Sequence, residues 1–257
     1  MKIFEPNFGI VELCVTYRCN VKCANCSNLC TQAPKNDGDL TPEDVRRFLD
    51  DSIEHNHKWG MITIHGGEPV LNPQIDEICR ILASYKHAQN PGCVLWLLTN
   101  NSSPEVKRRV TEMHTKYNIP LGISTKKGTN ADGKGNPIEY VPVNISAKDL
   151  GIDYDKGCFQ TSNCGVCYNY MGYFGCSPMA AAARVFGYEP VARSIKNFTR
   201  DKIMEAFNMH CGHCGFSIPG LKRDVCQCTT STWETMLGEY NAQWICLSDG
   251  RSTSPIL

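Results

Sequence analysis

Short apolar runs alternate with amphipathic stretches along the first half of the chain. Four runs predict strands: "IVELCV" at 10–15, "MITIHGG" at 61–67, "CVLWLLTNN" at 93–101 and "PLGIST" at 120–125. Between these runs, apolar residues recur at the spacing of a helix face. A strand that is followed each time by a helix predicts an α/β fold with a largely parallel sheet.

The expected helices have recognisable start signals. The stretch at 40–56 has Thr41 as N-cap and Pro42 at the first helical position, with acidic residues in the first turn. A helix over 103–117 starts in the same way with a serine and a proline, and another is expected over 73–85. Each helix therefore follows its strand directly, as in successive βα units.

The alternation of strands and helices ends after the fourth strand. Residues 126–140, "KKGTNADGKGNPIEY", form a polar loop, and "YVPVNIS" at 140–146 predicts a fifth strand with no helix before it. Cysteine dominates the remainder of the chain. We therefore expect a domain boundary near residue 150, with a core domain over 1–150 and a small Cys-rich module over 151–257.

Charge and composition exclude several partners. Lys plus Arg and Asp plus Glu both total 26 in 257 residues, so the chain has no excess charge to attract nucleic acid or an anionic membrane surface. No apolar segment is long enough to span a bilayer, and the N-terminus lacks a signal sequence. A cytoplasmic location is expected, where 16 cysteines indicate metal ligands or redox groups rather than disulfides.

Three closely spaced cysteines follow the first strand: Cys19, Cys23 and Cys26. The loop at the carboxyl end of a parallel strand is where α/β folds build their sites. A structural zinc site needs a fourth ligand, for which Cys30 is available. A four-iron cluster held by three cysteines instead leaves one iron open to an external ligand. The spacing alone leaves both alternatives open.

A second motif decides between them. The pattern Cys19-x3-Cys23-x2-Cys26 after a first strand, with "GGEP" at 66–69 ending the second, resembles the radical S-adenosylmethionine (radical SAM) enzymes over residues 10–145. The resemblance implies a (β/α) barrel with six units. The stretch from Ser124 to Cys158 is too short for two more complete units, so we expect a partial, abbreviated and open barrel.

The resemblance also implies roles for residues. The three cysteines bind a four-iron, four-sulfur cluster whose open iron binds the amino and carboxylate groups of S-adenosylmethionine (SAM). Glycines in "GGEP" allow close backbone approach, and Glu68 accepts a hydrogen bond from the ammonium group. The expected SAM contacts are Gly66, Gly67, Glu68, Thr99, Asn100, Ser124 and Lys126. Asn25 stands where the family has an aromatic residue, and is expected near the adenine.

Two of these assignments have simpler alternatives. The "TNN" stretch at 99–101 is also an ordinary strand end that turns into a helix cap, and Lys126 is also explained as a solvated charge.

The second half of the chain is similar to the auxiliary-cluster modules called SPASM and twitch. A hairpin expected to turn at Gly172 is flanked by cysteines, and "CGHC" follows a predicted helix. The ligands implied for a second four-iron cluster are Cys158, Cys176, Cys211 and Cys214, with Cys164 able to replace one of them. A zinc site built from "CGVC" and "CGHC" is the alternative.

For the reaction, we expect a small polar substrate such as a sugar or aminoglycoside, because the chain has no room for a leader-binding domain. Two interpretations of the polar loop at 126–140 are open: it lines that site, or it is a mobile loop exposed to solvent. An electron donor such as flavodoxin or ferredoxin is implied. The outcome is epimerisation or dehydrogenation, with epimerisation favoured. Cys226, Cys228 and Cys246 are the expected hydrogen donors. The alternatives are a peptide substrate presented by a separate partner and a non-catalytic metal module.

Overall fold

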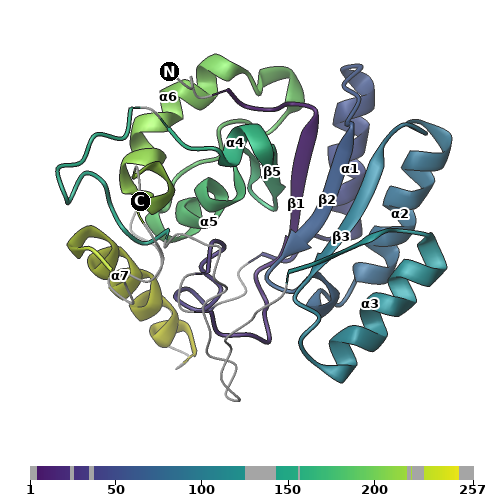
Figure 1. Cartoon of the computed structure of the whole chain (residues 1–257), viewed down its shortest axis with the longest axis horizontal. Helices are drawn as coiled ribbons and strands as arrows, with labels where there is room; N and C mark the ends of the chain where they lie inside the picture. Colours follow the sequence, from purple (N-terminus) through teal and green to yellow (C-terminus); the bar gives the residue numbers. More distant parts are fainter. Residues whose placement is uncertain are drawn as a thin grey trace.

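The computed structural model describes most of the chain. The described residues are 5–23, 26–34, 38–124, 143–155, 157–218, 221 and 229–248. Within them lies an open, six-stranded sheet with the order β4-β3-β2-β1-β5-β6 (Figure 1). Its strands are β1 (Ile10–Thr16), β2 (Met61–Gly66), β3 (Val94–Thr99), β4 (Leu121–Ile123), β5 (Val166–Asn169) and β6 (Gly172–Phe174). All neighbouring pairs are parallel except β5 and β6.

Helices follow the strands in the predicted order. The elements of the first half are α1 (Pro42–Glu54), η1 (Pro69–Leu71), α2 (Ile75–Ala88) and α3 (Pro104–Tyr117). The second half contains α4 (Gln160–Asn163), α5 (Ser177–Phe186), η2 (Ile195–Asn197), α6 (Arg200–His210), η3 (Cys211–His213), η4 (Gly215–Ser217) and α7 (Ser231–Ser248). Helices α1, α2 and α3 lie on one side of the sheet, and α5, α6 and α7 lie on the other (Figure 1). The prediction of a mixed α/β fold with a partial, open barrel is confirmed.

Strand β1 is the centre of the sheet because it has a parallel neighbour on each side. Leu13 pairs with Ile64 of β2 and with Tyr168 of β5. Val11, Leu13 and Val15 have no exposed surface. An almost continuous apolar strand is expected where both faces of a parallel sheet are covered. Strands run away from β1 in both directions, and such a switch point is where open α/β sheets bind ligands.

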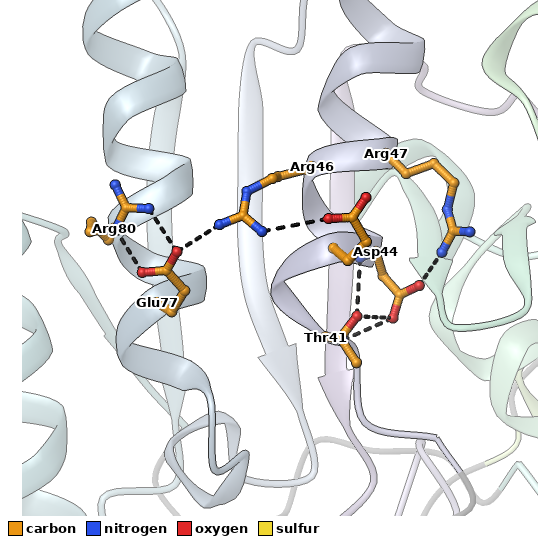
Figure 2. A network of polar contacts seen from close by, with 7 residues as sticks. Thr41, Asp44, Arg46, Arg47, Glu77 and Arg80 are labelled. Carbon is orange, nitrogen blue, oxygen red and sulfur yellow. Dashed lines mark hydrogen bonds and ion pairs between the residues drawn. The ribbon is translucent and has the colours of Figure 1, made fainter.

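Helix α1 begins where its start signals predict. Thr41 accepts a hydrogen bond from the Asp44 backbone N–H at 3.1 Å, and the Asp44 carboxylate accepts one from the Thr41 N–H at 2.9 Å. The same carboxylate pairs with Arg47 (Figure 2). Arg46 bonds Glu77 of α2 at 2.7 Å, which joins the two helices across their exposed faces. This exposed network makes only a small contribution to stability.

The predicted fifth strand is wrong in its described part. Residues 143–146 are not in a strand. The backbone of Val143 accepts a hydrogen bond from Gly215, and that of Asn144 accepts one from Thr230. Residues 143–147 are all buried, so the alternation of apolar and polar residues does not mark one covered and one open face. Among the described residues, the next strand after β4 is β5, and the hairpin predicted at Gly172 is confirmed.

The expected domain boundary near residue 150 stays a prediction. Strands from both sides of that position pair in one sheet, because β5 lies beside β1. Within the described residues, no helix is both long and apolar enough to cross a membrane.

Candidate active site

A cavity of about 250 Å³, here called the main cavity, opens at the carboxyl ends of β1, β2, β3 and β4. The predicted site residues that line it are Cys19, Cys23, Cys26, Gly66, Gly67, Thr99, Asn100 and Ser124. The same cavity is lined by Cys164, which was predicted as a possible ligand of the second cluster, and by residues that the motifs did not indicate: Glu12, His65, Gln160 and Ser177. The strand-end loops thus bring both predicted motifs to one opening.

The three thiols of the first motif are crowded together. Burial, and then the charges of Cys26 and Cys23, raise the pKa of Cys19 to about 12. Thiolates this close repel one another unless a cation holds them. In the described part of the chain, no three His, Cys, Asp or Glu side chains lie close enough to hold a single metal ion. The three thiols face a volume large enough for a multi-atom group, which fits an iron–sulfur cluster.

Cys30 is a neighbour of these thiols and does not line the main cavity. Its backbone N–H donates to the Cys26 sulfur at 3.4 Å. Its side-chain contact with Cys26, followed by burial, raises the pKa of Cys30 well above its usual range. Cys30 is therefore a neutral thiol beside Cys26, and its exclusion from the ligand set stays a prediction.

The two glycines of "GGEP" pack against the loop that carries the cysteines. A Cβ on Gly66 would lie 2.2 Å from the Thr16 carbonyl oxygen, and one on Gly67 would lie 2.2 Å from the Arg18 carbonyl oxygen. The Gly67 N–H donates to Thr16 at 2.8 Å. Only glycine permits this approach. In the described contacts, the glycines thus bring the β2 turn close to the cysteine loop, whereas the sequence suggested close approach to SAM.

Glu68 is fully buried and joins β2 to β3. Its carboxylate accepts hydrogen bonds from Thr99 Oγ1 at 2.9 Å and from the Asn100 N–H at 2.8 Å. Glu68 does not line the main cavity. Its contact with the SAM ammonium group therefore stays a prediction, while its observed contacts fix the residues at the end of β3.

Asn100 connects the end of β3 to the cysteine loop. Its Nδ2 lies 3.7 Å from the Cys19 sulfur and donates to Asn20 Oδ1 at 2.9 Å. The Ser124 N–H donates to the Thr99 carbonyl at 2.8 Å, which extends the edge of the cavity to β4. The proposed ribose and carboxylate contacts of these residues stay predictions.

Several predicted residues lie outside the described part of the chain. These are Asn25, Lys126, Cys226, Cys228 and the side chain of Cys246, together with the polar loop at 126–140.

Polar groups on the inner face of the sheet were missed by the motif analysis. Glu12 of β1 accepts a hydrogen bond from Ser177 Oγ at 2.6 Å. His65 of β2 is 4% exposed, and its Nε2 has no hydrogen-bond partner among the described residues. Burial lowers the pKa of His65, although the nearby Glu12 charge acts in the opposite direction. A charged residue within the apolar run of β1 was the available signal, because such a residue needs a polar cavity.

A second cavity gathers the cysteines of the C-terminal half. It is lined by Cys158, Cys176, Cys211 and Cys214, by the polar residues Gln160, Thr161, His210 and Ser217, and by Pro178, Met179, Ala182 and Phe216. Burial, and then the charges of Cys158, Cys211 and Cys214, raise the pKa of Cys176 well above its usual range. Three separate segments therefore bring together the four thiols predicted as ligands, and their ligand role stays a prediction.

Cys164 and Cys167 are not part of this group. Cys164 lines the main cavity, and burial followed by the charge of Glu12 raises its pKa to about 12. Cys167 is fully buried on β5, where it pairs with Glu12 and approaches Cys14. The alternative zinc site from "CGVC" and "CGHC" is therefore not the arrangement that the fold brings together. Gln160 and Pro178 line both cavities, so the two are adjacent.

His210 is the titratable group beside the four thiols. It is 3% exposed, and burial lowers its pKa to about 4, so its imidazole is neutral. The rings of Phe174 and Tyr188 contact it edge-on at 6.3 and 5.0 Å between centroids. The residue is therefore held in place by its aromatic neighbours.

Among solved structures similar to this chain, two match across most of its length. One is selenomethionine BtrN in an open conformation, with 17% identity, a TM-score of 0.47, and coverage of 90% of this chain and 99% of that one. The other is anSMEcpe with bound AdoMet and the Cp18Cys peptide, with 13% identity, a TM-score of 0.46, and coverage of 94% and 99%. At these values neither likeness carries an argument about this chain.

Curated protein sequences give no match to the chain. The sequence model described as "Radical SAM superfamily" matches residues 13–154, which is more than half of the 257 residues. This match includes the cysteine loop, the "GGEP" turn and the ends of β3 and β4. The chain belongs to the radical SAM superfamily, whose members use SAM and a four-iron, four-sulfur cluster.

Proposed function

We propose that this protein removes a hydrogen atom from a small polar substrate, such as a sugar or an aminoglycoside, bound in the main cavity. One observation carries the proposal. The cavity that contains Cys19, Cys23 and Cys26 also contains the polar inner-face groups Glu12 and His65. A substrate rich in hydroxyl or amino groups matches this lining, because buried polar groups need hydrogen-bond partners.

The cofactors are assigned to the strand-end side of the cavity. Cys19, Cys23 and Cys26 hold the cluster, and the SAM contacts are Gly66, Gly67, Thr99, Asn100 and Ser124, with Asn25 and Lys126 outside the described residues. When bound, the cluster supplies the electron that splits SAM into methionine and a 5′-deoxyadenosyl radical, which takes hydrogen from the substrate. A one-electron carrier such as flavodoxin or ferredoxin reduces the enzyme. The enzyme is assigned to the cytoplasm because its cysteine thiols must stay reduced.

The inner-face residues orient the substrate. Glu12, held by Ser177 at 2.6 Å, accepts a hydrogen bond from a substrate hydroxyl or ammonium group. The unpartnered Nε2 of His65 accepts a hydrogen bond from a second substrate hydroxyl group. Together they fix which carbon of the substrate faces the radical.

The C-terminal half holds a second four-iron cluster in a SPASM- or twitch-like module. Support comes from the four thiols of Cys158, Cys176, Cys211 and Cys214 around the second cavity. Their buried, largely apolar surroundings disfavour free thiolates, and a metal cluster relieves that cost.

Cys164 is proposed as the hydrogen donor if the reaction is an epimerisation. It lines the main cavity, whereas the three cysteines expected from the sequence lie outside the described side chains. The Cys164 S–H bond breaks as a C–H bond forms on the opposite face of the substrate radical. The resulting thiyl radical regains its S–H bond with one electron from the flavodoxin- or ferredoxin-type carrier and one proton from solvent. In a dehydrogenation, the substrate radical would instead release a hydroxyl proton to solvent and pass its second electron to the proposed second cluster.

The alternative function is modification of a peptide presented by a separate partner. Amino sugars and aminocyclitols in one panel, and cysteine- or serine-containing peptides in another, separate the two. The expected result is that only the first panel stimulates 5′-deoxyadenosine formation by the reduced, reconstituted enzyme. Stimulation by peptides alone would establish the alternative.

Isotope transfer identifies the outcome of the reaction. In deuterated water, epimerisation places one solvent deuterium on carbon, and Cys164→Ala abolishes that transfer while deoxyadenosine still forms. A ketone product without carbon-bound deuterium would make the enzyme a dehydrogenase. If Cys164→Ala leaves the deuterium transfer intact, the donor lies elsewhere.

A further inference from the structure

The second cavity contains two buried polar atoms without partners, beside its four thiols. Nδ1 of His210 and Oγ1 of Thr161 have no hydrogen-bond partner among the residues that the structure describes. Both side chains line the cavity, and they are 3% and 1% exposed. Leaving a buried donor unsatisfied is costly, so two such atoms at one cavity indicate a group that accepts from both.

Contacts with other parts of the chain hold both His210 and Thr161 in position. His210 is the last residue of α6, immediately before Cys211, and its ring contacts Phe174 and Tyr188. Thr161 lies in α4, and its carbonyl accepts a hydrogen bond from the Asn7 N–H at 2.8 Å. Neither side chain needs to move to reach the cavity that it lines.

We propose that His210, through Nδ1–H, and Thr161, through Oγ1–H, donate hydrogen bonds to sulfur atoms of the iron–sulfur cluster held by the four cysteines. This inference rests on the proposed second cluster. It adds two residues of this chain that set the cluster's reduction potential and keep it reducible.

The physical effect has a definite sign. Reduction adds one negative charge to the cluster, and the apolar walls formed by Met179, Ala182 and Phe216 oppose that charge. A hydrogen bond to a sulfur atom is strengthened by the added charge, so it favours the reduced form. His210 and Thr161 thus offset the apolar walls and raise the potential.

The test uses the full-length chain with Cys19, Cys23 and Cys26 all replaced by Ala, reconstituted anaerobically with ferrous iron and sulfide. Only the second cluster then contributes to the electron paramagnetic resonance signal. His210→Phe keeps an aromatic ring against its neighbours, and Thr161→Val keeps the side-chain shape. His213→Phe is the matched control, because His213 does not line the cavity and contacts Ser146 instead.

The midpoint potential is measured by titration with dithionite and mediators. His210→Phe is expected to shift the reduction equilibrium about tenfold toward the oxidised cluster, which is about 59 mV for a one-electron couple. Thr161→Val shifts it in the same direction by about threefold, since a hydroxyl is the weaker donor. His213→Phe leaves it unchanged.

Unchanged potentials in both His210→Phe and Thr161→Val would overturn the proposal. So would an altered signal shape with loss of iron in His210→Phe alone, because that outcome makes His210 an iron ligand. If the triple Ala variant binds no iron, the chain holds no second cluster and the proposal fails with it. SAM cleavage by the unmodified chain tests the first cluster independently of that result.

Discussion

The two cysteine sites of this chain are assembled in opposite ways. Cys19, Cys23 and Cys26 lie on one loop after β1 and face the main cavity, which also contains polar residues from β1 and β2. The four thiols of the second cavity come from the start of α4, the start of α5 and the turn after α6, and are surrounded mainly by apolar side chains. The first three thiols border a cavity of about 250 Å³, whereas the four thiols of the second site border one of about 10 Å³.

The difference indicates a division of labour. A site with three ligands and an adjacent polar cavity suits chemistry at an open iron. A site with four thiols, low solvent access and two orphaned donors suits electron storage, because its surroundings control the potential. The following variants test that division, from the largest expected effect to the smallest.

Replacement of Cys19, Cys23 or Cys26 by Ala is expected to abolish SAM cleavage. Each removal leaves an iron of the first cluster without its thiolate. The measurement is 5′-deoxyadenosine formed by the dithionite-reduced, reconstituted protein. Cys30→Ala is the matched control and should retain cleavage, since Cys30 does not line the main cavity. Full SAM cleavage by any of the three variants would contradict the assignment of these cysteines to the cluster that cleaves SAM.

Cys176→Ala should separate the two sites. We expect iron to fall from about eight to about four per chain, because the second cluster loses a ligand while the first keeps all three. Deoxyadenosine formation without substrate should stay within about threefold of the unmodified protein. Cys167→Ala is the control that keeps all the iron, as Cys167 lines neither cavity. Retention of about eight irons by Cys176→Ala would contradict the proposed ligand set.

Glu68→Gln distinguishes a positioning role from direct contact with SAM. The amide preserves an acceptor for the Asn100 N–H, so we expect SAM affinity to change less than about threefold. Glu68→Ala leaves the buried donors of Thr99 and Asn100 unpaired and should lower the free energy of unfolding by about 2–4 kcal/mol. Equilibrium dialysis and urea unfolding measure these two effects. A tenfold loss of affinity in Glu68→Gln at unchanged stability would instead indicate contact with the ammonium group.

The smallest effect concerns Asp149, which accepts hydrogen bonds from the first turn of α7. Asp149 is exposed, and its partial desolvation opposes the charged form, but hydrogen bonds from the Thr232 N–H and Oγ1 prevail and lower the pKa of Asp149 to about 2. Because the folded pKa is depressed, this stabilisation is complete above about pH 4 and is lost as pH falls toward 2. Asp149→Asn should therefore lower the Tm by about 1–2 °C at pH 7 and have no effect near pH 2. An equal loss at both pH values would exclude a charge effect.

The sequence by itself determined the elements and motifs that depend on local spacing. The strands and helices up to β4 lie close to their predicted positions, because periodicity and N-cap residues act within a few neighbours. The first cysteine motif is equally local, since its three thiols share one loop. The superfamily match over residues 13–154 agrees with that reading.

Tertiary structure decided everything that depends on pairing between distant segments. Whether Cys164 or Cys176 joins the second cavity depends on how β5 and α5 pack, which spacing does not encode. Glu12 and His65 line one cavity because the register of β1 against β2, in which Glu12 pairs with Thr63, places both side chains on the same face of the sheet. The stretch at 143–147 was predicted as part of a strand because its apolar and polar residues alternate. In the structure all five residues are buried, and alternation along a chain does not show which segments will cover it.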